Sequence, residues 1–323
     1  VAMLRLYARY LKQLGIAYSQ EFIADTLARH LDITRNLVAL FKSYFDPRYA
    51  ADKDRSERSD GLSQKIRQSL DAVDNVSEDL VLRGYLEVVE ATLRTNFFQT
   101  FDDGTAKSYI SVKLASAKIS LAPKPRPEYE IFVYSPRVEG VHLRGGKVAR
   151  GGLRWSDRLE DYRTEVLGLV KAQQVKNAVI VPTGAKGGFV AKQASMAAGR
   201  EAWLQEGVAS YMLYVQALLD ISDNLIDGAV VPPVNVVRRD GDDPYLVVAA
   251  DKGTATFSDI ANGISESNNF WLGDAFASGG GHGYDHKGMG ITARGAWIAV
   301  QRHFREIGMD IQSEDFTVVG VGD

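Results

Sequence analysis

The chain carries cationic side chains and a carboxylate in segments whose composition suits chemistry on a small anionic substrate. Lys186 lies within the sequence Gly-Ala-Lys-Gly-Gly at residues 184–188, and Lys176 precedes it by ten residues. Glycine lets the backbone approach a ligand closely, so we predict a glycine-rich turn that presents Lys186 to a substrate. A lysine becomes a base or nucleophile when burial or neighbouring cations lower its pKa, and Lys176 and Arg150 could supply that charge.

Two further segments add an arginine pair and an aspartate. Residues 150–154 read Arg-Gly-Gly-Leu-Arg, and guanidinium groups bind carboxylates through two parallel hydrogen bonds. Asp251 ends an apolar segment, and open α/β sheets place their ligands at the carboxyl ends of strands. A carboxylate at that place can exchange a proton with an amine. Together these residues predict proton transfer on a small anionic substrate.

Each of these residues also has an ordinary structural explanation. Lys186 could be a turn lysine that points into water, and Lys176 a cation favoured by the dipole of a helix end. Residues 150–154 could form a solvated turn. Asp251 could cap the following helix or pair with Lys252.

Other catalytic patterns are weaker or absent. His282 and His286 have a spacing that a metal could use, but their glycine-rich loop offers no helical face, so we expect ordinary surface histidines and no metal. Ser156 does not lie in the G-x-S-x-G pattern of hydrolases. Gly187 stands where a phosphate-binding P-loop needs Ser or Thr after its lysine.

Composition places the chain among globular proteins. Its 323 residues are 45% hydrophobic and 24% charged, which is ordinary for about two globular domains. The net charge of -3 gives no electrostatic case for nucleic acid or a membrane surface as a partner. No apolar run approaches the roughly 20 residues that a transmembrane helix needs. The absence of cysteine excludes disulfides and thiolate sites and fits a cytoplasmic protein.

Hydrophobic periodicity divides the chain into two regions. Apolar residues at helical spacing predict that residues 1–100 are mainly helical. After residue 108, strands alternate with helices, which predicts an α/β domain. We expect helices over residues 158–178, 200–220, 258–270 and 292–307. We expect strands over residues 110–114, 129–134, 179–181, 245–250 and 316–320.

The last residues predict the beginning of a further domain. An apolar run leads into Gly320 and Gly322, which could open the glycine fingerprint of a dinucleotide-binding fold. Because the sequence lacks an initial methionine and stops in an apparent strand, we expect an excerpt of a longer polypeptide. We therefore expect a mainly helical region at 1–105, an α/β substrate-binding catalytic domain at 106–313, and the first strand of a truncated Rossmann domain at 314–323.

In this order, residues 150–154, Lys176, residues 184–188 and Asp251 resemble the signature of glutamate dehydrogenases. The surrounding sequence is most similar to the large NAD-specific members of that family, and the resemblance covers roughly residues 85–323. It implies an α/β substrate domain of an amino-acid dehydrogenase, preceded by a helical region. It also implies NAD as the cofactor.

The resemblance implies a role for each matched residue. Lys186 matches the catalytic lysine that activates water and stabilises the carbinolamine intermediate. Asp251 matches the acid/base that exchanges protons with the substrate nitrogen. Lys176 matches the lysine that holds the α-carboxylate of the substrate, and Gly320 and Gly322 match the opening of the cofactor fingerprint.

The resemblance also implies that Arg150 binds the side-chain carboxylate of the substrate, with Gly152 beside it in the substrate site. Smaller family members have a lysine at the position of Arg150, so the charge is kept and the geometry changes. The spacing between Lys176 and Lys186 is also shorter than in those enzymes, which alters the turn before Lys186. A branched-chain amino-acid dehydrogenase would need an apolar residue at position 150, so Arg150 favours a dicarboxylate.

The expected reaction is the reversible, NAD-dependent oxidative deamination of L-glutamate to 2-oxoglutarate and ammonium. We expect the chain to act within a homo-oligomer of longer subunits and to be inactive alone, because most of a cofactor domain would lie beyond Asp323. Two alternatives stay open. One is an amino-acid dehydrogenase for another side chain, and the other is a non-catalytic regulatory domain of the same fold.

Overall fold

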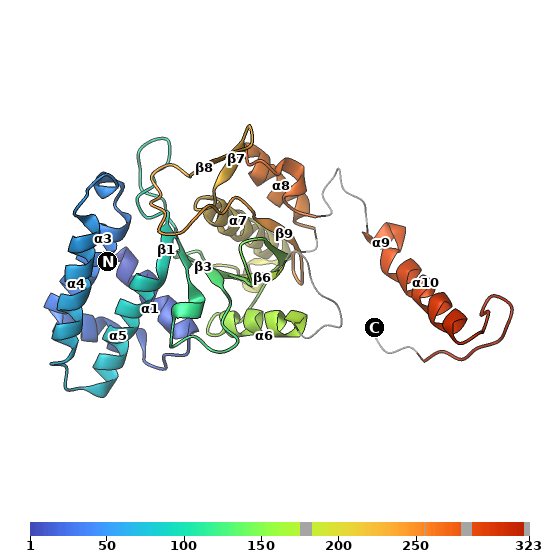
Figure 1. Ribbon diagram of the computed structural model, residues 1–323, viewed down its shortest axis with the longest axis horizontal. Coiled ribbons are helices and arrows are strands. Elements are labelled where there is room, and N and C mark those ends of the chain that lie inside the picture. Colours follow the sequence, from blue (N-terminus) through green and yellow to red (C-terminus); the bar gives the residue numbers. More distant parts are fainter. Residues whose placement is uncertain (175–182, 255, 279–285, 320–323) are drawn as a thin grey trace. The chain divides into compact units, whose positions relative to one another are not determined.

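The computed structural model describes residues 1–174, 183–254, 256–278 and 286–319. The chain divides into two compact units, Val1–Ser278 and Gly279–Asp323. The first unit combines a helical region with a seven-stranded sheet, and the second contains α9 and α10 (Figure 1). The predicted α/β class is therefore confirmed for the first unit.

The helices alternate with turns and strands along the chain. The α-helices are α1 Ala2–Gln13, α2 Gln20–Arg29, α3 Leu31–Phe45, α4 Arg55–Leu70, α5 Val76–Ala91, α6 Tyr162–Gln174, α7 Arg200–Leu219, α8 Ser258–Ser267, α9 His286–Met289 and α10 Ile291–Glu306. Among the described residues, the short 3₁₀ helices are η1 Pro47–Tyr49, η2 Ser116–Lys118, η3 Met196–Ala198 and η4 Gly273–Ala275. The predicted helices are thus present, with ends that differ by up to several residues.

The main sheet has the strand order β1-β2-β3-β4-β6-β5-β9. Its strands are β1 Thr92–Thr95, β2 Ile110–Leu114, β3 Tyr129–Tyr134, β4 Val138–Arg144, β5 Ala149–Trp155, β6 Thr183–Ala191 and β9 Val247–Ala250. Along the order β1-β2-β3-β4-β6, each neighbouring pair of strands is antiparallel. Strand β5 pairs parallel with both β6 and β9. A separate hairpin joins β7 Asn224–Ile226 to β8 Ala229–Val231.

Helices cover both faces of the main sheet (Figure 1). Val166 of α6 packs in one core cluster with residues of α1, α5 and the sheet. Tyr214 of α7 packs in a second cluster with Leu153, Phe189 and residues of α8. In the apolar run that ends with the edge strand β9, Leu246 and Val248 are buried, whereas Ala250 is exposed.

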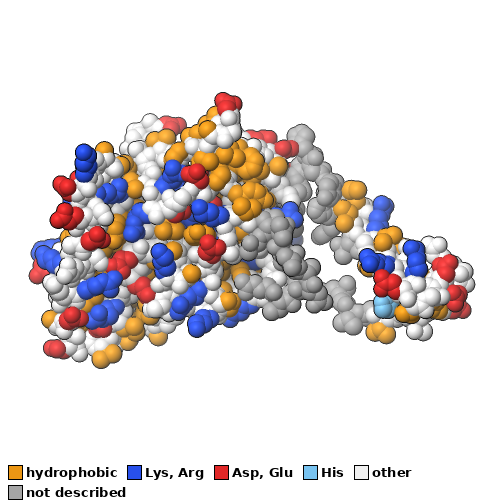
Figure 2. Space-filling view, viewed as in Figure 1, with side chains coloured by type: hydrophobic (Ala, Val, Ile, Leu, Met, Phe, Trp, Pro, Cys, Tyr) orange, Lys and Arg blue, Asp and Glu red, His pale blue; other side chains and the backbone are white. Residues whose placement is uncertain are grey.

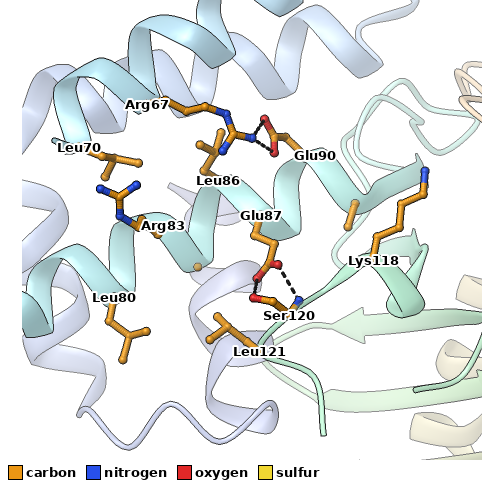
Figure 3. A pocket seen from close by; sticks show the side chains of 12 residues that line it. Arg67, Leu70, Leu80, Arg83, Leu86, Glu87, Glu90, Lys118, Ser120 and Leu121 are labelled. Carbon is orange, nitrogen blue, oxygen red and sulfur yellow. Dashed lines mark hydrogen bonds and ion pairs between the residues drawn. The ribbon is translucent and has the colours of Figure 1, made fainter. Parts of the chain in front are cut away.

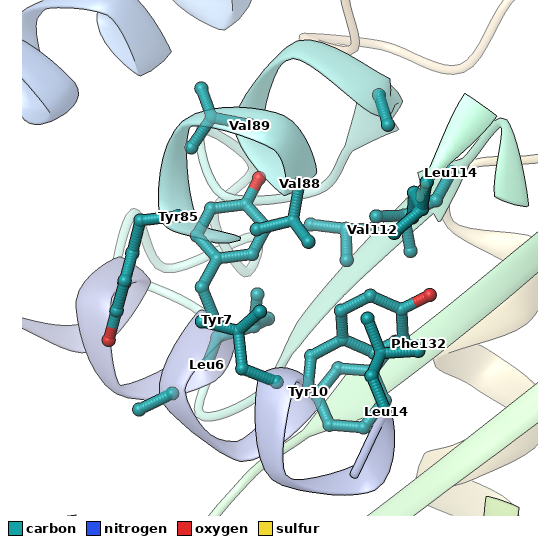
Figure 4. Packing of buried hydrophobic residues seen from close by; sticks show 14 of the residues in the cluster. Leu6, Tyr7, Tyr10, Leu14, Tyr85, Val88, Val89, Val112, Leu114 and Phe132 are labelled. Carbon is teal, nitrogen blue, oxygen red and sulfur yellow. The ribbon is translucent and has the colours of Figure 1, made fainter. Parts of the chain in front are cut away.

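The helical region shares one hydrophobic core with the sheet, as Figure 4 shows. Tyr10 of α1 packs on Phe132 of β3 with ring centroids 5.1 Å apart. The hydroxyl of Tyr7 forms a 2.8 Å hydrogen bond with Thr92. Residues 1–91 therefore pack directly on the sheet, and the expected division at residues 105 and 313 stays a prediction.

Helix α5 shows how local sequence sets an element boundary. The side-chain oxygen of Asn75 accepts hydrogen bonds from the backbone N–H groups of Ser77 and Glu78, at 2.9 and 3.2 Å. An N-cap side chain satisfies backbone donors that have no partner within the helix. Helix α5 therefore begins at Val76, directly after its N-cap Asn75.

Buried ion pairs connect the segment before β9 with the antiparallel part of the sheet. Arg94 donates to Asp223 at 2.9 Å, and both side chains are fully buried. Lys113 and Arg144 both donate to Asp243, at 2.6 and 2.8 Å. Buried charges need such partners, since an unpaired one is costly.

The predicted glycine-rich turn is part of a strand, and so is the segment for which a solvated turn was the alternative explanation. Residues 184–188 lie inside β6, and residues 150–154 lie inside β5. The prediction read the glycines as turn residues, but here they relieve crowding between packed elements. A Cβ on Gly188 would lie 2.6 Å from Val166 of α6, and one on Gly187 would lie 2.5 Å from Leu153. The predicted strand at 179–181 lies outside the described residues.

The second unit is organised around α10. Phe316 packs on Phe304 and Trp297, with ring centroids 5.1 and 6.4 Å away. Residues 316–319 form no strand, which corrects that prediction over the described part of the segment. A strand needs a neighbour to complete its backbone hydrogen bonds, and residues 316–319 pair with no other segment in the described part of the chain. The expected Rossmann domain stays a prediction.

Acidic and basic side chains are interspersed over the face of the first unit that Figure 2 shows. This mixture agrees with the small net charge of -3. Within the described parts of the chain, we find no helix that is both long and apolar enough to cross a bilayer.

Candidate active site

Lys186 and Asp251 are 65 residues apart in sequence and lie side by side in the fold. The Lys186 Nζ lies 3.4 Å from the Asp251 Oδ2, and the two side chains are 22% and 16% exposed. Lys186 projects from β6, while Asp251 directly follows β9. The structure therefore gives Lys186 a carboxylate partner in a partly enclosed site, unlike a turn lysine that points into water.

Strand β5 lies between these two strands and contributes a row of residues to the same face. Arg150 is in register with Gly184 of β6, and Lys186 follows Gly184 by two residues. Because side chains alternate along a strand, Arg150, Gly152 and Arg154 project to the same side of the sheet as Lys186. The glycine-rich segments thus line one surface between β6 and β9.

Gly152 leaves the space that Asp251 occupies. A Cβ at position 152 would lie 3.0 Å from the Asp251 Cβ and 3.3 Å from its Oδ2. It would also lie 3.0 Å from the carbonyl oxygen of Ala250. The structure therefore explains Gly152 by close packing against the carboxylate beside Lys186.

Two hydrogen-bond donors hold the Oδ1 of Asp251. The backbone N–H of Lys252 donates to Oδ1 at 2.7 Å, and the Arg154 Nη2 donates to the same oxygen at 3.2 Å. The backbone N–H of Asp251 itself donates to the Thr254 hydroxyl at 3.0 Å. The next helix, α8, begins at Ser258, so Asp251 does not cap it.

These contacts favour the ionised form of Asp251. Burial alone would raise the pKa of the carboxyl group. The hydrogen bond from the Lys252 N–H and the positive charges of Lys186 and Arg154 outweigh burial and lower the pKa below its usual value. At neutral pH, Asp251 is therefore a carboxylate that can accept a proton.

Arg154 links Asp251 to helix α6. Its Nη1 donates to the Glu165 Oε1 at 3.1 Å, and the Ser156 hydroxyl donates to the Glu165 Oε2 at 2.6 Å. From the sequence, Arg154 is part of the Arg-Gly-Gly-Leu-Arg motif and has no predicted role of its own. The available signal was strand alternation, since Arg154 is two residues from Gly152 and shares its face.

The remaining predicted site residues differ in what the structure shows. Arg150 is exposed on β5 and makes no side-chain hydrogen bond or ion pair with another described residue. Lys176 follows the end of α6 at Gln174 but lies outside the described residues. Gly320 and Gly322 also lie outside them.

A separate surface pocket lies among α4, α5 and η2, as Figure 3 shows. Its volume is about 580 Å³. Arg67 pairs with Glu90 across it, and Glu87 accepts hydrogen bonds from the backbone and hydroxyl of Ser120. Because these groups already satisfy one another, the pocket gives no reason to place the chemistry there.

No cluster of three His, Asp or Glu side chains that could hold a metal occurs among the described residues. The spacing of His282 and His286 cannot be assessed, because these side chains lie outside the described set.

Comparison with known proteins identifies the family. Residues 65–323 match the family model described as bacterial NAD-glutamate dehydrogenase, catalytic domain. The chain belongs to this family. Residues 1–47 match a second model, described as glutamate dehydrogenase, helical motif 3. The second match agrees with the helices found at the start of the chain.

Individual relatives agree with the family assignment. The chain is 61% identical over 324 residues to an NAD-specific glutamate dehydrogenase of Pseudomonas aeruginosa and 61% identical over 323 residues to one of Halomonas elongata. It is 57% identical over 332 residues to one of Mycobacterium tuberculosis. All three alignments include 100% of this chain and only 20% of the relative. The chain thus spans about a fifth of the length of these glutamate dehydrogenases.

Proposed function

We propose that the longer protein containing this chain catalyses the NAD-dependent oxidative deamination of L-glutamate to 2-oxoglutarate and ammonium. The observation that carries the proposal is the Lys186–Asp251 pair, whose Nζ and Oδ2 are 3.4 Å apart on the face that residues of β5 also line. Family membership and the names of the relatives support the choice of glutamate and NAD.

Arg150 and Lys176 are proposed to bind the two carboxylates of glutamate. An amino acid with a side-chain carboxylate needs two separated cations besides any catalytic lysine. Arg150 projects to the same face of the sheet as Lys186. Its guanidinium makes no hydrogen bond or ion pair with another described residue. Gly152, between Arg150 and Arg154, leaves room for the Asp251 carboxylate beside the expected place of the substrate.

Lys186 is proposed to activate the water that attacks the Cα of the iminium formed from glutamate. Its ammonium form can also stabilise the oxygen of the resulting carbinolamine. Proton transfer by a positioned side chain contributes typically about 10²–10⁴-fold to an enzymatic rate. The partial enclosure of Lys186 at 22% exposure limits competing hydration of the amine.

Asp251 is proposed to exchange a proton with the substrate nitrogen. It takes a proton from the ammonium of bound glutamate and returns one to the nitrogen of the carbinolamine, so that ammonia can leave. The low pKa of Asp251 keeps it ready to accept that proton at neutral pH. Its Oδ2, which faces Lys186, is the oxygen nearest to this chemistry.

NAD, when bound, accepts the hydride that leaves the glutamate Cα. Gly320 and Gly322, which are expected to meet this cofactor, lie outside the described residues. Among the described residues, Arg150 is thus proposed for substrate binding, and Lys186 and Asp251 for proton transfer. The homo-oligomeric state and the cytoplasmic location remain predictions from the sequence.

The proposal is tested with the full-length protein, by following NADH oxidation in the presence of 2-oxoglutarate and ammonium. Lys186→Ala is expected to reduce kcat by at least about 10²-fold, since the base is lost. Lys118→Ala is the matched control, because Lys118 is an exposed lysine on η2, in the wall of the separate pocket.

Each alternative gives a different result. Poor turnover of 2-oxoglutarate beside good turnover of another 2-oxo acid would indicate a dehydrogenase for a different side chain. A folded, NADH-binding wild type without activity on any 2-oxo acid would support a non-catalytic domain. Equal activity of the wild type and Lys186→Ala would overturn the role of Lys186.

A further inference from the structure

The two oxygens of the Asp251 carboxylate have different surroundings. Oδ1 accepts the backbone N–H of Lys252 at 2.7 Å and the Nη2 of Arg154 at 3.2 Å. Oδ2 faces the Lys186 Nζ at 3.4 Å, a longer and weaker contact. The two donors at Oδ1 fix the rotation of the carboxylate and leave Oδ2 directed toward the lysine.

Arg154 is itself held from a second element. Glu165 of α6 accepts its Nη1 at 3.1 Å, and the other Glu165 oxygen accepts the Ser156 hydroxyl at 2.6 Å. Arg154, Glu165 and Asp251 are each only 16–18% exposed. A chain of hydrogen bonds therefore runs from α6 through β5 to the residue after β9.

We propose that Arg154 is a positioning residue that holds Asp251 with Oδ2 turned toward Lys186 and the substrate nitrogen. This inference rests on the proposed glutamate dehydrogenase function. Arg154 acts through Asp251, and Glu165 acts through Arg154. Positioning of this kind matters because small displacements of a reacting group cost large factors in rate.

The arrangement also sets the charge state of Asp251. With Arg154 removed, the carboxylate loses one of two donors to Oδ1 and one of the two nearby cations, Lys186 and Arg154. Burial and the Lys252 N–H remain, so the pKa of Asp251 is expected to rise. Since Asp251 must be ionised to accept a proton, the acid limb of the kcat–pH profile moves to higher pH.

The test compares kcat and KM against pH for full-length wild type, Arg154→Gln and Arg154→Lys. We expect Arg154→Gln to lower kcat about 10–100-fold and to shift the acid limb upward, with a smaller change in the KM for glutamate. Arg154→Lys keeps the positive charge, so we expect it to shift the acid limb less than Arg154→Gln does. Glu165→Gln is expected to shift it in the same direction by a smaller amount.

Arg158→Gln is the matched control. Arg158 follows β5 closely and pairs with Asp161, but both side chains are about half exposed. Its removal is expected to leave the kcat–pH profile unchanged. If Arg154 had only a structural role, its substitution would lower thermal stability. The acid limb of the kcat–pH profile, measured for the enzyme that remains folded, would then not move.

The outcomes separate this inference from the proposed function. An active wild type whose acid limb is the same in Arg154→Gln overturns the role of Arg154 and leaves the glutamate dehydrogenase proposal standing. An increase in KM alone would also overturn it, because Arg154 would then contact substrate directly. A folded, cofactor-binding wild type without glutamate-dependent activity overturns both.

Discussion

At the scale of single residues, the glycines around Lys186 and Asp251 are explained by what lies next to them. Gly152 has no positive φ, yet a Cβ there would crowd Asp251 at 3.0 Å. Sequence reasoning identified the position and could not identify this neighbour, because the two residues are 99 positions apart in the chain. Glycine here serves close approach rather than a turn.

His142 is a second residue whose role only the fold reveals. It lies on β4 opposite Gly187, it is fully buried, and both of its ring nitrogens lack a described hydrogen-bond partner. Burial and the nearby charge of Arg144 lower the pKa of the imidazole to about 3, although Asp243 acts in the opposite direction. The imidazole is therefore neutral in the folded protein near neutral pH.

We predict that His142 makes the folded state less stable in mild acid. Between its unfolded pKa of about 6.5 and its folded pKa of about 3, the unfolded state binds a proton that the folded state does not. Stability from this group is therefore complete above about pH 6.5 and declines as the pH falls toward 3. Chemical denaturation at pH 7 and pH 5 should show a smaller difference for His142→Leu than for wild type. An identical difference in both proteins would contradict the assignment.

At the scale of elements, strand β6 packs closely against its neighbours on both faces of the sheet. Gly184 faces Gln173 of α6, and Gly187 faces Leu153 and Tyr214 on the opposite side. These contacts differ in how easily they yield, because a Gln side-chain end can rotate whereas a packed core cannot.

We predict that Gly187→Ala destabilises the protein more than Gly184→Ala. The new Cβ at position 187 would lie 2.5 Å from the Leu153 Cδ2 and 2.7 Å from the Tyr214 Oη, in a packed core. Overpacking of this kind costs roughly 1–3 kcal/mol. At position 184 the Cβ would meet the flexible end of Gln173 at 2.4 Å, so a smaller loss is expected. Chemical denaturation of the two variants measures the difference, and equal losses would show that β6 is loosely packed on the Tyr214 side.

At the scale of the whole molecule, the helical region and the sheet are expected to unfold together. They share one core, with Tyr10 of α1 packed on Phe132 of β3 at 5.1 Å. Buried hydrogen bonds such as Tyr7–Thr92 cross the same boundary. Contacts of this density make residues 1–278 one compact unit.

We predict that Tyr10→Ala weakens both regions at once. Truncation of a buried aromatic side chain costs about 3–5 kcal/mol. Hydrogen exchange of the full-length protein should then accelerate in β2 and β3 as well as in α1 and α5. Leu31→Ala is a control, because Leu31 is 51% exposed. Faster exchange confined to the helices would show that they form an independent domain.

Sequence alone determined the class of the fold and the residues with chemical potential. Periodicity separated a helical region from an α/β region, and both are present because burial of an apolar face is a local pattern. The same reading selected Lys186 and Asp251, since their residue types and their flanking glycines and apolar runs are visible in the chain. The matched segments also gave the family, which the comparison confirmed.

The secondary structure of those segments, and the side chains that meet between them, depend on how distant parts of the chain pack. Residues 150–154 and 184–188 are strands rather than turns, because glycine marks both turns and close packing, and sequence cannot distinguish the two. The hydrogen bonds from Arg154 to Asp251 and Glu165 join three elements distant in the chain. Such contacts depend on how β5, β9 and α6 pack, and no local pattern encodes that packing.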